Sequence, residues 1–317
     1  MSTTTAPTVR HSRSGLAGQL SELGVERSGV LLVHASMRAV GSVSGGVRTV
    51  VAALRDALGG HGTLVVPAFT PENSDTSRHY LDRVRGLSDR AREAVRASMP
   101  PFDPATSAAP SMGRLAEAVR LTEGAVRSDH PQTSFAALGP SARKLMAHHR
   151  PDCHLGEDSP LARLYDLRAH VLMLGTGFDT CTAFHLGEYR VPAPPRRTYR
   201  CVVTAGGRRR WWEYEDVALD DSDFAALGAD FARSGNGATV RIGPVGSSTS
   251  RLFRFTDAVD FASRRLPLHR GGVPVQAQLD GCAAAGPTDF GGELLTPRTP
   301  ALTVSDTRSD GRISPLG

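Results

Sequence analysis

The sequence predicts an α/β fold with a central, mostly parallel sheet flanked by helices, a long insertion and a C-terminal antiparallel hairpin region. Two short apolar runs, Val30–His34 and Thr63–Pro67, have the composition of buried strands. Between them Val47–Leu58 places apolar residues at helical spacing and stops at two glycines. A strand, a loop, a helix and a second strand in this order are the usual seed of a parallel sheet.

The elements after this unit are less regular. Residues 71–110 are polar and interrupted by prolines, which predicts an insertion with at most one helix, near Leu87–Arg96. Ser111 is a possible N-cap for the helix that follows. We expect helices over Ser111–Val119, Pro140–His149 and Pro160–Leu167, the last two starting with proline in the first turn, and a buried strand over His170–Gly175.

The pattern changes after Arg190. Two alternating runs, Tyr199–Thr204 and Arg208–Glu215, surround Ala205-Gly206-Gly207 and predict a hairpin. A helix over Asp221–Arg233, a strand over Thr239–Ile242 and a closing helix over Phe255–Leu266 follow. We expect a flexible tail at 1–14, one domain over 15–267, and a disordered tail at 268–317, where 50 residues hold 8 Gly, 5 Pro and one aromatic.

Composition narrows the possible partners. The net charge is +5, yet the only tight basic run is Arg208–Arg210. A solvated hairpin explains this run better than a nucleic-acid surface does, and no apolar run approaches the ~18 residues of a membrane span. The four cysteines are too few and too scattered for a disulfide framework, and residues 1–14 lack the apolar core of a signal peptide. We therefore expect a cytoplasmic protein that binds neither nucleic acid nor membrane.

His185 and Glu188 form the most informative pair. They stand three residues apart, shortly after the apolar run His170–Gly177, and that spacing places them on one face of a helix. The pair suits a histidine base oriented by an acid. Taken alone, it is equally compatible with two ordinary neighbours on a protein surface or in a core.

Two loops could bind an anionic group. Val33–Gly46, between the first strand and helix, is rich in Ser and Gly, so its backbone can approach a phosphate or an acyl carrier. It matches neither the P-loop nor the dinucleotide motif, which argues against nucleoside triphosphates and NAD. In Arg127–Phe135, an arginine and serines surround a rigid His-Pro, and His130 could act as a second base. Ordinary structural loops remain the alternative for both.

Three other patterns carry less weight. His148-His149-Arg150-Pro151-Asp152 is one residue short of the histidine motif of another acyltransferase class. A zinc site from Cys153, His154, Cys181 and His185 would lack a C-x-x-C pair and would need adjacent Cys-His ligands, so we expect no metal. G-x-S-x-G is absent, which excludes a serine-hydrolase elbow.

Taken together, these segments resemble the aminoglycoside 3-N-acetyltransferase family, antibiotic acetyltransferases unrelated to the GNAT fold. Order and spacing agree from about residue 15 to 267. The segments that carry the resemblance are Leu32–Ser36 through Gly45-Gly46, Gly62–Pro67, Met99–Pro104, Arg127–Pro131 with Ser134-Phe135, Ser159–Tyr165, and Leu174–Asp179 running into His185 and Glu188.

The resemblance implies transfer of acetyl from acetyl-CoA to the 3-amino group of a 2-deoxystreptamine aminoglycoside, with antibiotic resistance as the outcome. It places His185 on the family's catalytic histidine and Glu188 on the acid that follows. It also implies direct transfer, although the family usually has Asn at Cys181 and Ala at Gly187. The residues where the family holds CoA are His34, Ala35, Ser36, Ser42, Val43, Ser44, Gly45, Arg127, Ser128, His130, Ser134 and Phe135.

Two further expectations concern acids. A carboxylate must orient His185, and Glu215, within 213–216, is the first choice, which leaves Glu188 facing the substrate. Because the protein is basic and the substrate a polycation, local acids must attract it. The candidates are Glu72, Asp75, Asp103, Asp179 and Glu188. We expect a monomer or homodimer. A non-catalytic drug-binding protein and an acyltransferase for another amine remain alternatives.

Overall fold

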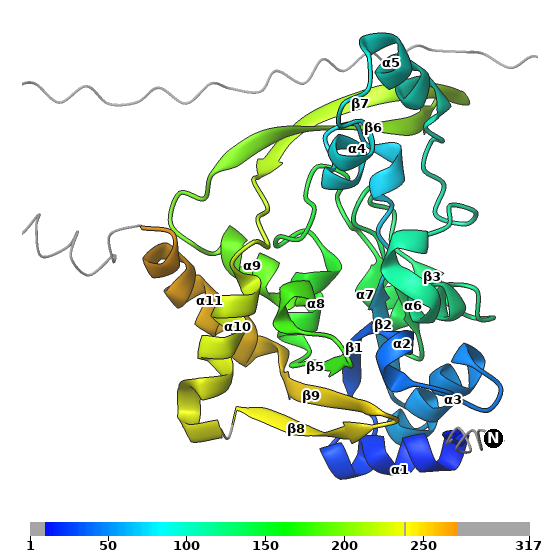
Figure 1. The fold of residues 1–317 in the computed structure, drawn as a ribbon, viewed down its shortest axis with the longest axis vertical. Helices are drawn as coiled ribbons and strands as arrows, with labels where there is room; N and C mark the ends of the chain where they lie inside the picture. The colour runs from blue at the N-terminus through cyan, green and yellow to red at the C-terminus, as the bar shows by residue number, and fades with distance from the viewer. Residues whose placement is uncertain (1–9, 238, 272–317) are drawn as a thin grey trace, which may run out of the picture. The chain divides into compact units, whose positions relative to one another are not determined.

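The computed structural model describes residues 10–237 and 239–271, and its centre is a seven-stranded mixed sheet (Figure 1). β1 pairs in parallel with both β2 and β5, while the outer strands pair antiparallel. The order is β3-β4-β2-β1-β5-β9-β8, and the bounds are Val126–Arg127, Phe135–Leu138, Thr63–Pro67, Val30–Ala35, His170–Leu174, Ser248–Arg254 and Val240–Val245.

Alternating side chains of β1 explain how helices cover both faces of this sheet. Leu32 belongs to one hydrophobic cluster, while Leu31 and Val33 belong to the other. The Leu32 side is covered by α7 Ala142–Met146, α8 Pro160–Asp166, α9 Ala183–Tyr189, α10 Phe224–Arg233 and α11 Phe255–His269. The other side is covered by α1 Arg13–Leu23, α3 Val47–Leu58 and α6 Gly113–Arg120.

The expected α/β fold is confirmed, and α3 and β2 have the predicted bounds. Several other boundaries differ. α1 begins inside the stretch expected to be a tail, because Ser12 accepts a hydrogen bond from the Gly15 N–H and caps it. Ser111 does not cap α6, since its hydroxyl binds Glu72 instead. β3, β4 and β9 escaped prediction because they are short or polar.

The insertion holds two α-helices rather than at most one. They are α4 Arg78–Arg83 and α5 Asp89–Ser98, whose N-termini are capped by Ser77 and Ser88. α5 is the helix expected near Leu87–Arg96, whereas α4 escaped prediction because it has six residues, of which Tyr80 alone is buried. Shorter turns in the described chain are α2 Met37–Val40, η1 Pro71–Asn73, η2 Pro110–Met112, η3 Phe178–Thr180 and η4 Ser234–Gly237.

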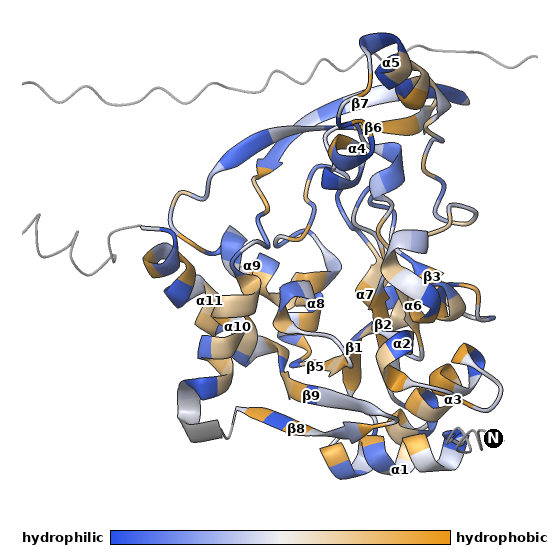
Figure 2. Ribbon diagram, in the orientation of Figure 1, coloured by the Kyte–Doolittle hydropathy of each residue, from blue (hydrophilic) through white to orange (hydrophobic). Residues whose placement is uncertain are grey.

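The predicted hairpin is confirmed as β6 Arg196–Ala205 and β7 Arg208–Val217, a separate two-stranded sheet. Gly206 and Gly207 form its turn with φ of +58° and +70°, which glycine adopts without strain. Figure 2 shows hydrophilic residues along much of this hairpin, whereas the central strands are hydrophobic.

The hairpin and the insertion pack against each other and are joined by hydrogen bonds. Tyr80, Val84, Met99 and Val202 form a small hydrophobic cluster between them. Arg209, from the basic run, donates to the Met99 carbonyl and to the carbonyl of Arg96 in α5. That arginine therefore binds the carboxyl end of a helix, where a cation is favourable. Across the described residues, no helix combines the length and apolar character needed to cross a membrane.

Candidate active site

A cavity of about 430 Å³ lies beyond the carboxyl ends of the parallel strands β1, β2 and β5. In open α/β sheets this edge is the usual place for a ligand. Its lining comes from five parts of the chain: Val33–Ser36; Pro67 with Phe69; Ser111–Gly113 with Leu115 and Ala116; Thr176, Asp179, Thr180, Thr182 and His185; and Asp221 with Phe224.

His185 lies on α9, and its Nδ1 is 2.5 Å from the Glu188 Oε2. The carboxylate can only accept, so it fixes the proton of the neutral imidazole on Nδ1. The ring packs against Phe224 at 4.7 Å between centroids, and its side chain is 14% exposed. Nε2, for which the described residues supply no hydrogen-bond partner, is the nitrogen left to exchange a proton in the cavity.

Glu215 does not have the expected role. Its carboxylate binds Arg196 at 3.0 Å across the hairpin, and its side chain is 63% exposed. The acid that orients His185 is Glu188, which is 2% exposed and therefore lies behind the histidine rather than facing a substrate. Alternation along β7 explains the difference, because Glu215 faces outward where its neighbour Asp216 faces inward.

The buried Glu188 is fully hydrogen-bonded. Its Oε1 accepts from the Asp220 N–H at 3.1 Å and from Arg270 at 2.7 Å. Arg270 also binds Asp223 at 2.7 Å. Partial burial alone would lower the pKa of Arg270, but its hydrogen bonds with Asp223 and Glu188 raise it. Arg270 thus neutralises the acid that orients the histidine, although it lies beyond the expected domain end at residue 267.

This contact gives a prediction about where the chain can be shortened. Ending it after Gly271 should leave activity and melting temperature nearly unchanged, as expected from the composition of the remaining tail, which lies outside the described residues. Ending it after Pro267 should lower the stability by about 1–3 kcal/mol, because Glu188 loses a charged partner. kcat should fall as well. Steady-state kinetics and thermal melts of both truncations check this, with Arg270→Ala in the full chain separating this contact from loss of the last helical turn.

His34, at the end of β1, is a second imidazole in the cavity lining. Burial, together with the nearby His185, lowers the pKa of His34 to about 3. It is therefore neutral at physiological pH. Its Nε2 is buried without a hydrogen-bond partner among the described residues. Ala35 and Ser36 follow in the lining, and the Ser36 hydroxyl caps α2 by accepting from the Ala39 N–H.

The loop after α2 leads away from the cavity to the N-terminus of α3. Ser42 and Ser44 pair with the backbone of His11, which fixes the loop against the N-terminal segment together with Val43. Gly45 and Gly46 have φ of +77° and +67°, a region that residues with a Cβ rarely adopt. The loop is therefore fixed in place, with Ala35 and Ser36 at the cavity and Ser42–Gly45 outside its lining.

Within the described part of the chain, none of the residues 127–135 lines the cavity. Arg127 donates to the Ala68 and Ser107 carbonyls and to Ser134, and burial lowers its pKa to about 10. Phe135 is in the hydrophobic core. The expected anion-binding loop is instead a buried support that ties the end of β2 to the insertion, because its polar groups are occupied by the protein itself.

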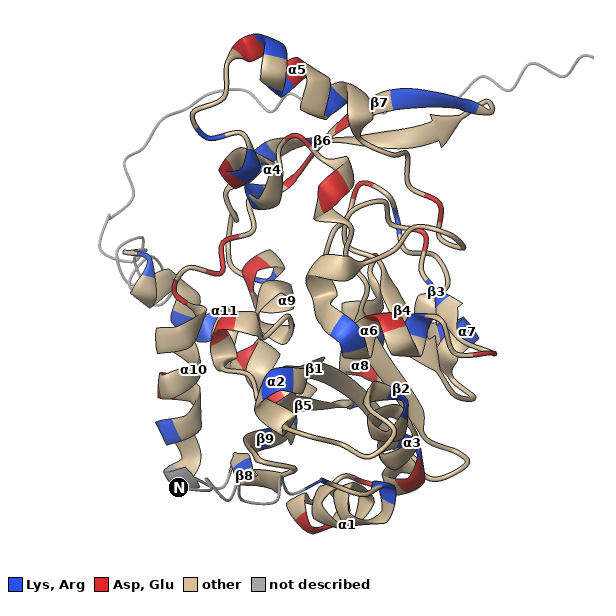
Figure 3. Cartoon of the chain, turned by 45° about the vertical axis from the view of Figure 1, so that its right-hand side comes forward, with Lys and Arg blue, Asp and Glu red and all other residues tan. Residues whose placement is uncertain are grey.

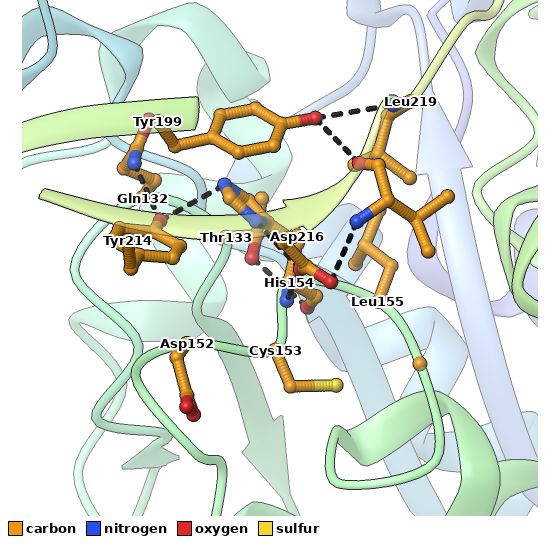
Figure 4. A network of polar contacts seen from close by, with 12 residues as sticks. Gln132, Thr133, Asp152, Cys153, His154, Leu155, Tyr199, Tyr214, Asp216 and Leu219 are labelled. Atoms are coloured by element: carbon orange, nitrogen blue, oxygen red, sulfur yellow. Dashed lines mark hydrogen bonds and ion pairs between the residues drawn. The ribbon is translucent and has the colours of Figure 1, made fainter. Parts of the chain in front are cut away.

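Ser128 and His130 belong to a buried polar network under the hairpin, and Figure 4 shows the part of it around His154, Tyr214 and Asp216. His154 binds Asp216 through Nδ1 at 3.0 Å, and its Nε2 lies 3.1 Å from the Tyr214 hydroxyl. Burial would raise the pKa of Asp216, but hydrogen bonds from His154 and Tyr189 lower it. The network continues from the His154 carbonyl to His149, which binds Ser128 at 3.0 Å.

The histidines of this network predict acid sensitivity. Burial lowers the pKa of His130, His149 and His154, that of His149 to about 3. Because the unfolded chain takes up these protons near pH 6.5, the free energy of unfolding should be largest above that pH. His149 alone, with a folded pKa of about 3, should lower it by about 1.4 kcal/mol per pH unit as the pH drops from 6.5 towards 3, and His130 and His154 add to the loss in the same direction. Urea unfolding between pH 7.5 and 5 measures this slope. In His149→Gln it should decrease by about one proton, and an unchanged slope would contradict the assignment.

Some of the acids expected to bind the substrate lie at the cavity, and others are paired elsewhere in the protein. Asp179 lines the cavity and is exposed, and Glu72 binds Ser111 at its rim. Asp75, however, is buried and paired with Arg200 of the hairpin, so it holds the insertion in place. Asp103 is exposed and accepts from the Ala105 N–H in its own turn. Asp221, which the sequence did not single out, lines the cavity.

The cysteine and glycine that depart from the family have structural explanations. Cys181 is fully buried in the core, and burial raises the pKa of its thiol to about 12. It remains a thiol rather than a nucleophilic thiolate. A Cβ on Gly187 would lie 2.6 Å from the Ala262 Cβ, so the glycine allows α9 to approach α11 closely.

The other expected and rejected motifs are accounted for by their surroundings. His149 is buried against Ser128, while Asp152 pairs with Arg150 on the surface. Over the described ranges, no group of three or more His, Cys, Asp or Glu side chains is arranged to hold a metal ion. Phe69, Met112, Asp221, Phe224 and Arg270 are the contributors that sequence reasoning missed, since only the folded chain brings them to His185.

A histidine oriented by a buried carboxylate at the carboxyl edge of a parallel sheet is an arrangement that α/β enzymes use for general-base catalysis. The sequence profile of the family described as aminoglycoside 3-N-acetyltransferase matches residues 32–267. Aminoglycoside N(3)-acetyltransferase IX of Micromonospora chalcea is 38% identical over 266 residues, or 79% of this chain and 92% of the relative. The chain belongs to the aminoglycoside 3-N-acetyltransferase family, whose members are acyl-CoA-dependent acetyltransferases.

Solved structures agree with this assignment. The YokD protein of Bacillus subtilis has a TM-score of 0.76 and 31% identity, over 84% of this chain and 97% of that one. A binary complex of AAC-IIIb with CoASH has a TM-score of 0.71 and 32% identity, over 84% of this chain and 99% of that one.

Proposed function

We propose that this chain transfers acetyl from acetyl-CoA to the 3-amino group of 2-deoxystreptamine aminoglycosides and so confers resistance to them. The observation that carries the proposal is the His185 Nδ1–Glu188 pair, 2.5 Å apart, at a cavity beyond the parallel strands. The family assignment supports the reaction, and the name of the Micromonospora relative supports the substrate class.

His185 is the proposed general base. The substrate amine attacks the thioester carbonyl, a C–N bond forms, and the C–S bond breaks to release CoA. His185 Nε2 takes the proton of the amine and returns it to the leaving sulfur, so no proton is gained or lost by the enzyme. Glu188 holds the imidazole in the required tautomer and balances its charge when protonated. The buried, thiol form of Cys181 supports direct transfer rather than an acyl-cysteine intermediate.

Acids at the cavity would attract the cationic substrate. Asp179 and Asp221 line it, and Glu72 lies at the rim through Ser111. Asp221 is already paired with Arg78 at 2.8 Å, but both side chains are largely exposed, and such surface pairs are weak. A substrate ammonium group can therefore replace Arg78 at little cost. The proposed substrate side is therefore at Asp179 and Asp221 and not at Asp75, whose charge Arg200 neutralises.

The proposal includes a cytoplasmic location and a monomer or homodimer. Cys153, Cys181 and Cys201 are free thiols, as in proteins of reducing compartments.

The deciding experiment incubates the purified full chain with acetyl-CoA and a panel of aminoglycosides, follows thiol release, and locates the acetyl group by NMR. Release of CoA with 3-N-acetylated product supports the proposal. Tight aminoglycoside binding without thiol release would identify a non-catalytic binding protein. Thiol release only with other amines would identify an acyltransferase of different specificity.

A further inference from the structure

Two polar side chains of the active-site cavity each keep a buried atom without a hydrogen-bond partner. They are His34, at the end of β1, and Thr176, just after the end of β5. Six buried side-chain atoms of the described residues lack a partner, and His34 Nε2 and Thr176 Oγ1 are two of them. A buried polar group without a partner costs about 1–3 kcal/mol, so two such groups in the lining of one cavity indicate that a ligand completes their hydrogen bonds.

The pairing of β1 with β5 brings these two side chains to the same edge of the sheet. The strands are parallel neighbours, with Ala35 opposite Leu174. Gly175 turns the chain directly before Thr176 with φ of +69°, a region that favours glycine. The Ser36 N–H donates to the Leu174 carbonyl at 2.9 Å, so this backbone donor is already occupied. Side chains must therefore supply the hydrogen bonds that a ligand would receive here.

His34 lies on the side of the sheet that carries His185. Alternation along β1 places it on the face of Leu32, which α9 covers, and both imidazoles line the cavity. Burial and the nearby His185 keep His34 neutral, so it remains a neutral N–H donor when His185 takes up a proton. Figure 3 shows no Lys, Arg, Asp or Glu on β1 or β5. The groups offered at these two strand ends are thus uncharged donors.

Transfer of an acyl group from a thioester creates a need for such donors. When the amine nitrogen bonds to the thioester carbon, the electron pair of the C=O bond moves onto the oxygen, and it returns when the C–S bond breaks. Neutral N–H and O–H groups that are fixed before the reaction stabilise this oxyanion without transferring a proton. A neutral imidazole can polarise a carbonyl in the same way.

We propose that His34 and Thr176 donate hydrogen bonds to the carbonyl oxygen of the acyl thioester and to the oxyanion that forms from it. This inference rests on the proposed function for the reaction. Both side chains touch the reacting oxygen, and neither gains or loses a proton. The transfer of the proton from the amine to the leaving sulfur stays with His185.

The direct test observes the thioester carbonyl without any turnover. Acetyl-CoA labelled with carbon-13 at this carbonyl is bound to the full chain in the absence of an acceptor, and difference infrared spectroscopy records its stretching band. Hydrogen bonds weaken the C=O bond, so the band should lie at lower frequency than in buffer. His34→Leu should lose most of this shift and Thr176→Val part of it. His34→Gln and Thr176→Ser, which keep a donor, should retain it.

Matched controls and kinetics complete the test. His79→Leu and Thr198→Val make the same changes at exposed positions of α4 and β6, and they should behave as wild type. Loss of one oxyanion donor typically lowers kcat by about 10²–10³-fold. His34→Leu should therefore lower kcat by this factor, with Thr176→Val acting in the same direction, while the KM for acetyl-CoA changes little.

Other outcomes separate this inference from the proposed function. If the carbonyl band of His34→Leu matches that of wild type, His34 does not bind the thioester oxygen, and the inference is wrong even where aminoglycosides are acetylated. A lower kcat with an unchanged band would likewise mark His34 as a structural residue only. If the band depends on His34 but no aminoglycoside is acetylated, the inference stands and the proposed acceptor is wrong. Circular dichroism confirms folding, and His34→Phe, which fills the space of the imidazole, repeats the measurement should His34→Leu not fold.

Discussion

His185→Ala is expected to fold normally and to lose about 10²–10⁴-fold in kcat, the usual contribution of a general base. The imidazole is the group whose Nε2 faces the cavity while Glu188 holds Nδ1, so its removal leaves no nearby group to take the amine proton. The KM for acetyl-CoA should change little, because the proposed binding contacts lie elsewhere. Steady-state kinetics with thiol detection measure both constants.

The matched control for this variant is His79→Ala, an exposed histidine on α4. It should retain wild-type kinetics. The ring of His185 also packs on Phe224, so thermal melts must show that the loss of turnover does not follow from unfolding. A folded His185→Ala protein with near-normal kcat would falsify the assignment of the base. Such a result would direct attention to His34, the other imidazole of the cavity lining.

Local patterns were sufficient to predict the centre of the fold. The helix at 47–58 and the strand at 63–67 have the predicted bounds because their apolar periodicity is long or unbroken and glycine or proline ends them. The hairpin at 196–217 is signalled by Gly206-Gly207. By contrast, β9 begins Ser-Thr-Ser-Arg, and α4 has six residues, of which Tyr80 alone is buried, so neither has an apolar pattern long enough to predict it. Their structure is set by neighbours distant in sequence, β5 for β9 and Val202 of β6 for α4.

The candidate site, like the fold, has parts that local sequence patterns predict and parts that only distant contacts determine. His185 and Glu188 are near in sequence and share one helical face, so spacing alone brings them together. Glu188 also contacts the Asp220 N–H, 32 positions away, and Arg270, 82 positions away. No periodic pattern in the sequence predicts contacts over such distances. The expectations at 127–135 failed for a physical reason as well. A motif shows which groups could bind an anion, but not whether the protein's own carbonyls and hydroxyls already occupy them.

Glu188→Gln is expected to reduce kcat by about 10²–10⁴-fold, as removal of the orienting carboxylate does in other histidine-based sites. The physical reason is the number of hydrogen-bond acceptor atoms that the side chain offers at this position. The carboxylate accepts from His185 on one oxygen and from Arg270 and the Asp220 N–H on the other. An amide has only one acceptor oxygen, so its NH₂ must face either the His185 Nδ1–H or the two donors on the opposite side. If the NH₂ faces His185, it favours the opposite tautomer of the imidazole. If the amide oxygen faces His185, the NH₂ opposes two donors, which displaces the side chain and leaves Arg270 without its carboxylate. In both arrangements His185 loses the negative charge that balances its protonated form.

The matched control for Glu188→Gln is Glu215→Gln, which makes the same chemical change at the exposed acid first expected to orient the histidine. Its partner Arg196 is half-exposed and pairs with it across the hairpin, so kcat should remain at the wild-type level. Kinetics well below the melting temperature separate misorientation of His185 from loss of stability, and the KM for acetyl-CoA should stay constant in both variants. The opposite result, with Glu215→Gln inactive and Glu188→Gln active, would show that the hairpin moves onto the site when substrates bind. The acid that orients His185 would then be the one on β7.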